Sequence, residues 1–289
     1  MKADQVLPFV FETIPVRGAL IHLSRSWRRM LRDHDYEPVI QDTLGHAAAA
    51  TGLIAQSLKF DGAVTLQIQG DGELRMLVVQ CTSELEVRGI ATTAEGPAEA
   101  LSFADLIENA HCAITVDAGE RPYQGIVEID RESLAASLEN YFYRSVQVPS
   151  HVVLTSDEAF SGGLLLQQMP SRSSIDGDDW RRLGLVAATL EAGDFAASAA
   201  GIDLIGKLFA EDDVRVYQAK PVSFHCQCTR SRAEDVLRML GEAESLDAVT
   251  EQGRLEVTCE YCGRRRSFDA IDIARLFADN VVSGSDSVQ

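Results

Sequence analysis

Cys226-Gln227-Cys228 and Cys259-Glu260-Tyr261-Cys262-Gly263 decide the fold of the C-terminal part of this chain. They supply two close pairs of cysteines, the first of the form CxC and the second of the form CxxC. Four cysteine thiolates can hold one zinc ion tetrahedrally, and CxxC followed by glycine is typical of the tight turn in a zinc knuckle. The sequence therefore predicts a site for one Zn²⁺ per chain, with Cys226, Cys228, Cys259 and Cys262 as the ligands.

The spacing leaves the role of this site open between a static structural zinc site and a redox switch. A CxC pair is tighter than the CxxC of ordinary fingers, so its two thiols lie close enough to exchange the metal for a disulfide. Zinc contributes about 10–16 kcal/mol to small metal-folded units. An oxidant that converts the close pairs to disulfides would therefore eject zinc and unfold the unit. His225 is an alternative ligand, but on an extended chain it points away from its neighbour Cys226.

Charge and cysteine usage restrict the compartment and the partners. The chain of 289 residues carries 26 basic and 44 acidic residues, a formal charge of -18. This charge opposes binding to nucleic acid and to anionic membranes. The N-terminal residues lack the apolar stretch of a signal peptide, and no segment has the roughly 20 apolar residues of a membrane span. We therefore expect a cytoplasmic protein, in which thiols stay reduced and the isolated Cys81 and Cys112 behave as small buried hydrophobes.

Residues 1–170 predict an α+β domain with an antiparallel sheet. Strands are expected from Val16 to Leu23 and from Val64 to Val79, the latter as a hairpin that turns at residues 70–72. Ser24 is expected to cap a short helix, and Pro38 to open a longer one. Further strands and a helix are expected up to residue 170.

The remainder of the chain divides into a helical linker, a small zinc unit and a tail. Residues 171–220 are rich in alanine, glycine and acidic side chains, and Phe195 is the only large apolar side chain in the middle of them, so this linker is expected to be helical but metastable. Residues 221–280 form the zinc unit, in which Ser231 and Glu234 have the spacing of a capping box and Gly241 can end the helix. Residues 281–289 are expected to fray.

Several segments along nearly the whole chain resemble the heat-shock protein 33 family, the redox-regulated heat-shock chaperones of bacteria of about thirty-three kilodaltons. The most specific is Phe224-x-Cys226-x-Cys228-Thr229-Arg230 together with Cys259-x-Tyr261-Cys262-Gly263, because generic zinc ribbons lack this asymmetric spacing. The other resembling segments are 16–18, 57–62, 69–72, 123–125, 141–145 and 162–170.

The resemblance implies an ATP-independent holdase chaperone that protects unfolded proteins from aggregation. Such a chaperone is inactive while reduced and zinc-bound. Oxidation would pair Cys226 with Cys228 and Cys259 with Cys262, release zinc, unfold the C-terminal part and activate a form that is usually a homodimer. The region that corresponds to residues 171–220 acts in this family as the sensor of folding. Unfolded or aggregation-prone client proteins are the implied partners.

Two other classes of protein compete with this interpretation. A thiol–disulfide oxidoreductase would use Cys259 and Cys262 as a redox dithiol, but such motifs work best at the N-terminus of a helix, and Gly263 favours a knuckle followed by a strand. A zinc-ribbon module that binds nucleic acid has only the nearby arginines in its favour. Because no nucleophile and base or pair of catalytic carboxylates stands out, we expect no enzymatic activity.

Overall fold

The computed structural model describes residues 3–94, 102–119, 121–170, 175–197 and 201–282, and its contacts divide the chain into two units, Met1–His225 and Cys226–Gln289. Residues 221–225 thus belong to the first unit. None of the helices in these described ranges is both long enough and apolar enough to cross a membrane.

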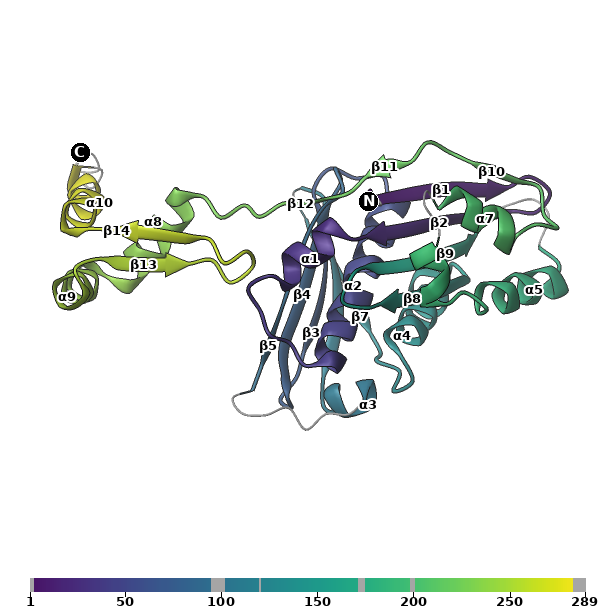
Figure 1. Cartoon of the computed structure of the whole chain (residues 1–289), viewed down its shortest axis with the longest axis horizontal. Coiled ribbons are helices and arrows are strands. Elements are labelled where there is room, and N and C mark those ends of the chain that lie inside the picture. Colours follow the sequence, from purple (N-terminus) through teal and green to yellow (C-terminus); the bar gives the residue numbers. More distant parts are fainter. Residues whose placement is uncertain (1–2, 95–101, 120, 171–174, 198–200, 283–289) are drawn as a thin grey trace. The chain divides into compact units, whose positions relative to one another are not determined.

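The first unit contains two sheets of six strands each within its described residues (Figure 1). Sheet A has the order β10-β1-β2-β9-β8, and β11 also pairs with β1. Sheet B has the order β12-β5-β4-β3-β6-β7, in which the short strand β12 runs parallel to β5. The strands of sheet A are β1 (Gln5–Phe11), β2 (Val16–Leu23), β8 (Ser150–Ser156), β9 (Ser161–Gln168), β10 (Val214–Val216) and β11 (Lys220–Pro221). Those of sheet B are β3 (Ala63–Gln69), β4 (Leu74–Thr82), β5 (Glu86–Thr93), β6 (His111–Asp117), β7 (Tyr123–Val127) and β12 (Ser223–Phe224).

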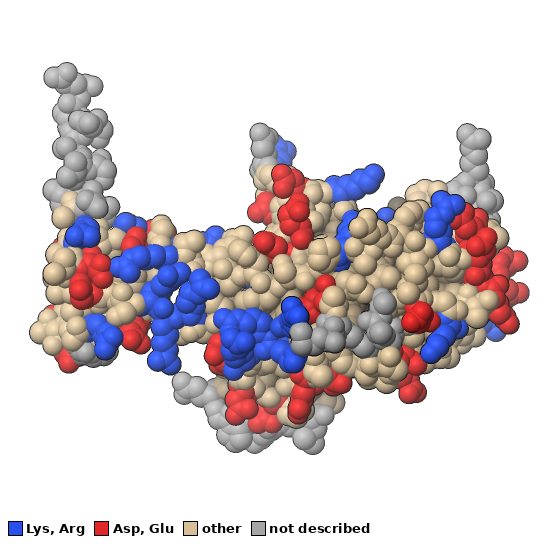
Figure 2. All heavy atoms as spheres, turned by 45° about the horizontal axis from the view of Figure 1, so that its top comes forward, with Lys and Arg blue, Asp and Glu red and all other residues tan. Residues whose placement is uncertain are grey.

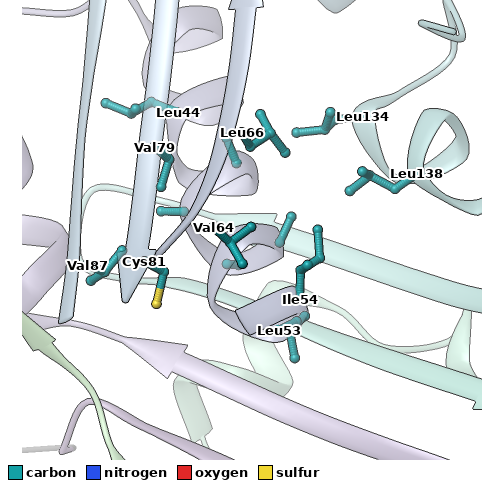
Figure 3. Close-up of a cluster of buried hydrophobic side chains, with 14 of the residues drawn as sticks. Leu44, Leu53, Ile54, Val64, Leu66, Val79, Cys81, Val87, Leu134 and Leu138 are labelled. Carbon is teal, nitrogen blue, oxygen red and sulfur yellow. The ribbon is translucent and has the colours of Figure 1, made fainter. Parts of the chain in front are cut away.

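Helix α2 (Pro38–Ser57) lies between the two sheets and forms the centre of the core (Figure 1). It begins at Pro38, as predicted, because proline has no N–H to leave unbonded in the first turn. Small residues such as Ala47 and Gly52 let strands of both sheets approach it closely. Figure 3 shows Leu53 and Ile54 of this helix as members of the buried apolar cluster that also contains side chains of sheet B. The other helices before residue 150 are α1 (Arg25–Leu31), α3 (Phe103–Leu106), α4 (Leu134–Tyr141) and the π-helical segment η1 (Phe142–Val146).

The predicted linker packs against the other face of sheet A. It forms α5 (Gly177–Ala187), α6 (Ala192–Ala197) and α7 (Ile202–Leu208). Phe195 is 1% exposed, so the one large apolar side chain in the middle of the linker is fully buried. A Cβ built on Gly162 of β9 would lie 2.7 Å from its ring, so the glycine leaves the space that the ring fills. Bidentate hydrogen bonds of 2.6 and 3.0 Å from Arg182 to Asp212 join the start of the segment to its end.

The cap of α1 differs from the prediction. Ser24 occupies the N-cap position, but its side chain makes no capping hydrogen bond. The carboxylate of Asp4 accepts instead from the backbone N–H groups of Ser24, Arg25 and Ser26 at 2.7, 2.9 and 2.6 Å. Burial opposes the negative charge of Asp4, but a hydrogen bond from the Ser26 side chain and these backbone hydrogen bonds outweigh it and lower the pKa of Asp4 below its usual value of 3.8. A residue that directly precedes β1 therefore fixes the start of the helix.

Replacing Asp4 by alanine is expected to destabilise the first unit by about 2 kcal/mol, because three backbone donors lose their acceptor. Since the folded-state pKa of Asp4 is depressed, its contribution to stability is present above about pH 4 and is lost as the pH falls through the folded value. Urea denaturation followed by the fluorescence of Trp27 and Trp180 at pH 7 and pH 3 measures both effects. D35A, at an exposed aspartate, is the control. Equal midpoints for D4A and D35A at pH 7 would contradict the cap.

The second unit is a hairpin with three helices: α8 (Arg230–Leu240), α9 (Glu242–Gln252), β13 (Leu255–Thr258), β14 (Arg265–Phe268) and α10 (Ala270–Val282). The capping-box prediction is wrong by two residues, since the Thr229 hydroxyl, not that of Ser231, accepts from the backbone N–H of Arg232. Gly241 ends α8 as predicted. Helix α10 continues to Val282, and the remainder of the predicted tail lies outside the described residues. The α+β fold class is confirmed.

Candidate metal centre

The CxxC segment forms a tight turn between β13 and β14. The backbone N–H groups of Cys262 and Gly263 both donate to the carbonyl oxygen of Cys259, at 3.3 and 2.8 Å, and Cys259 N–H donates to the carbonyl of Arg264 at 2.9 Å. Gly263 has φ +63°, in the left-handed region that glycine adopts without steric cost. This turn brings Cys259 and Cys262 to one end of the hairpin.

The CxC segment leads directly into α8. Cys226 and Cys228 precede Thr229, whose backbone N–H donates to the carbonyl of Gln227 at 2.9 Å and whose hydroxyl caps the helix. The side chain of Arg266 on β14 donates from Nη2 to the carbonyl oxygen of Cys228 at 3.1 Å. This bond ties the CxC segment to the hairpin.

The four sulfur atoms of these two segments lie within 4.8 Å of one another. Two short contacts join one segment to the other: Cys226 Sγ to Cys259 Sγ is 3.6 Å, and Cys228 Sγ to Cys262 Sγ is 3.3 Å. All four cysteines are free thiols, since a disulfide requires about 2.05 Å between its sulfurs. Such a cluster can hold a metal ion. The sequence prediction thus named four residues that the fold brings together.

The thiols of this cluster differ in how readily they ionise. Burial, reinforced by hydrogen bonds with Cys262 and Cys226, raises the pKa of Cys228 to about 12. Burial also raises the pKa of Cys259. At Cys262, burial acts in the same direction, but the hydrogen bond from the backbone N–H of Arg264 and those with the neighbouring thiols outweigh it and lower the pKa of Cys262. Local backbone donors thus favour a negative charge on Cys262.

Two arginines near the cluster contact residues other than the cysteine side chains. Arg230 forms ion pairs with Glu234 at 3.2 Å and with Asp272 at 2.8 Å, and its guanidinium lies 4.6 Å from the centre of the Phe268 ring. It therefore fastens α8 to α10 and β14. Arg266 approaches the cluster through the carbonyl of Cys228.

The remaining candidates lie away from this cluster. His225 belongs to the first unit, where its Nδ1 lies 3.6 Å from a carboxylate oxygen of Glu86. Cys81 and Cys112 are buried in sheet B, as predicted, and Figure 3 shows Cys81 within the apolar core. Burial raises the pKa of Cys81 and of Cys112 to about 12. These two thiols are therefore protonated and enclosed.

The chain is similar to known proteins along nearly its whole length. A family model described as "Hsp33 protein" matches residues 4–269. The 33 kDa chaperonin of Methylobacillus flagellatus is 38% identical, with 99% of each chain covered, and that of Nitrosococcus oceani is 39% identical, with 96% of each chain covered. A crystal structure of a 33 kDa chaperonin (heat shock protein 33 homologue) from Thermotoga maritima has a TM-score of 0.80 at 22% identity, covering 96% of this chain and 99% of that chain. At this identity the structural likeness shows the fold.

Proposed function

The chain belongs to the Hsp33 family, and we propose that it is a redox-regulated, ATP-independent holdase that binds unfolded client proteins and keeps them from aggregating. The observation that carries this proposal is the cluster of four thiols, drawn from two segments about thirty residues apart in sequence. The relatives described above are named as chaperonins, in agreement with the expectation that the chain is not an enzyme.

The proposed ligands of one Zn²⁺ per chain are Cys226, Cys228, Cys259 and Cys262. An all-sulfur donor set suits zinc, and sulfurs about 2.3 Å from a tetrahedral ion lie roughly 3.8 Å from one another. The separations of 3.3 and 3.6 Å between the two segments, with all four sulfurs within 4.8 Å, fit such a site after small adjustments. A bound zinc ion supplies a structural cross-link there. The hydrophobic core of the second unit is small, and its buried members are Ala233, Leu237, Val249, Phe268, Ile273 and Leu276.

Oxidation is proposed to form the disulfides Cys226–Cys228 and Cys259–Cys262. Formation of each disulfide from two thiols releases two protons and two electrons, and these reduce one molecule of hydrogen peroxide to two molecules of water. Two short sulfur contacts of the reduced structure join the two segments, whereas the proposed disulfides lie within each segment. Oxidation would therefore remove the connection between the segments as well as the thiolates that bind zinc, and the second unit would unfold.

The first unit is proposed to contain both the chaperone core, residues 1–170, and the sensor of folding, residues 171–220. The sensor is held by its contact with sheet A, where Phe195, Leu204 and Ile205 are buried. Its detachment would uncover these side chains together with apolar side chains of the sheet, which is the kind of surface that binds unfolded clients. A cytoplasmic location and a homodimer in the oxidised state complete the proposal.

Replacing Phe195 by alanine is expected to weaken the attachment of this sensor by about 3–5 kcal/mol, because the ring fills the space above Gly162. Backbone amides of α5, α6 and α7 would then exchange with solvent faster, and the oxidised protein would hold clients at a lower temperature than wild type does. Hydrogen exchange detected by mass spectrometry and client aggregation assays measure both. L185A is the control, since Leu185 is 64% exposed on the same segment. Identical exchange in F195A and L185A would rule out this role for Phe195.

The structure gives less support to the two competing functions. Cys259 lies in a turn between two strands and not at the start of a helix, so no helix dipole favours its thiolate for disulfide exchange. The arginines expected to attract nucleic acid are partly paired with acidic side chains, as at Arg230. The proposed function is tested by titrating one reduced, zinc-loaded sample with hydrogen peroxide while zinc release, far-UV circular dichroism and client aggregation are followed together.

A further inference from the structure

Helix α1 presents a cluster of arginines that the proposed function does not use. The cluster consists of Arg25, Arg28, Arg29 and Arg32, the last of which is the C-cap residue of the helix. Because residues three or four positions apart lie on the same side of a helix, the four arginines share one face of α1. Figure 2 shows Lys and Arg side chains gathered on one compact area of this part of the surface. Such a concentration of positive charge stands out in a chain with a formal charge of -18.

The four arginines line one side of a cavity of about 880 Å³. The opposite side comes from the chain around β12, including Ser223 and the ring of Phe224. The guanidinium of Arg29 lies 5.9 Å from the centre of the Phe224 ring, an arrangement that holds α1 and β12 at a fixed spacing. The cavity is therefore built from two elements of the first unit and is not a plain helix surface.

The positive charge of this cavity is largely uncompensated among the residues that the structure describes. Asp4 is the one carboxylate that lines the cavity, and both of its oxygens already accept hydrogen bonds from backbone N–H groups of α1. Arg25, Arg28 and Arg32 are exposed and form no ion pair within the described part of the chain. Their guanidinium groups thus have donors left for an external anion.

We propose that this cavity binds an oligophosphate, a short chain of linked phosphates, either inorganic or carried by a nucleotide. The fork of the guanidinium group matches the oxygens of phosphate in a bidentate manner. Arg32 lies seven positions after Arg25, which corresponds to about 10 Å along a helix. An anion with several charges in a row can engage the arginines along this length, whereas a single phosphate can reach only part of them. The Phe224 ring offers an apolar contact for the base of a nucleotide.

Isothermal titration of the full-length, reduced, zinc-loaded chain with sodium tripolyphosphate at 150 mM salt tests this site. One tripolyphosphate is expected to bind per chain, and R25Q/R28Q/R32Q is expected to weaken binding by at least about tenfold. The matched control is R121Q/R131Q/R181Q, which removes the same charge from exposed arginines of the same unit that do not line the cavity. Because oligophosphates can chelate zinc, the zinc content of each sample is measured after the titration.

The outcomes separate the site from general electrostatic attraction. No binding to the wild type, or an equal loss of affinity in both triple variants, would overturn the proposal. Slower amide exchange of residues 222–225 with bound tripolyphosphate would support it, because β12 forms one wall of the cavity. Titrations with ATP and with AMP identify the source of the phosphates. Tighter binding of ATP than of tripolyphosphate indicates a nucleotide, and equal binding of the two with none of AMP indicates that the phosphate chain alone is recognised.

Discussion

Removal of the metal from the reduced protein is expected to unfold the second unit while the first unit stays folded. The proposed ligands Cys226, Cys228, Cys259 and Cys262 all belong to the second unit. The hydrophobic core of that unit contains few buried side chains, so packing cannot replace a metal contribution of about 10–16 kcal/mol. The first unit has extensive cores on both faces of sheet A, so it is expected to stay folded when the metal is removed.

Treatment with a strong zinc chelator under reducing conditions tests this expectation. Zinc release measured with a metal-sensitive dye should coincide with a loss of helical circular dichroism from α8, α9 and α10, and trypsin should then cleave near Arg254 and Arg275. The variant C262S should behave like the chelated protein. C112S, which alters a buried thiol of sheet B, should keep its zinc and its helices. A chelated protein that remains ordered through residues 226–282 would contradict the structural role of the metal.

Peroxide combined with mild heating is expected to convert the protein from a form that barely affects client aggregation to one that suppresses it at nearly equimolar amounts. The proposed switch requires two events, because oxidation would unfold the second unit and warming would detach the helices that cover sheet A. Light scattering of a denatured client, diluted into buffer with reduced or oxidised protein and without nucleotide, measures the activity. Addition of dithiothreitol and zinc should reverse it.

Two cysteine variants test which thiols respond to peroxide. C81S/C112S should be activated like the wild type, because burial raises the pKa of both thiols to about 12 and keeps them out of reach of peroxide. C226S/C228S should lose zinc without any oxidant and should no longer respond to peroxide by releasing it. Equal suppression of aggregation by the reduced and the oxidised wild type would refute the redox switch.

The sequence predicted those elements of the fold whose formation depends on residues close together in the chain. The strand from Val16 to Leu23 and the start of α2 at Pro38 are confirmed, because the apolar pattern and the missing N–H of proline act within a few residues. The four clustered thiols also followed from spacing. In contrast, β1 (Gln5–Phe11) and α9 (Glu242–Gln252) were missed. The first contains Pro8, which argues against a strand, and the second offers few apolar side chains to mark its buried face.

Features that depend on distant parts of the chain did not follow from the sequence. The cap of α1 comes from Asp4, which precedes it by an entire hairpin of sheet A, so no local motif points to it. Likewise, the sequence around Phe195 gives no sign that this side chain is buried. The reason is the space above Gly162 of β9, which is distant in sequence and which the ring fills. The cavity beside α1 is a third example, since Phe224 reaches it through the parallel pairing of β12 with β5.

The thiol cluster lies entirely within the second unit, which begins at Cys226. Every sulfur of the cluster, the hairpin that carries two of them and the helices that pack on that hairpin follow this point in the sequence. Residues 226–282 therefore form a self-contained cassette. Fused to an unrelated carrier protein, such a cassette would report oxidants through its own loss of zinc, and a fluorescent label placed on α10 would turn that loss into an optical signal.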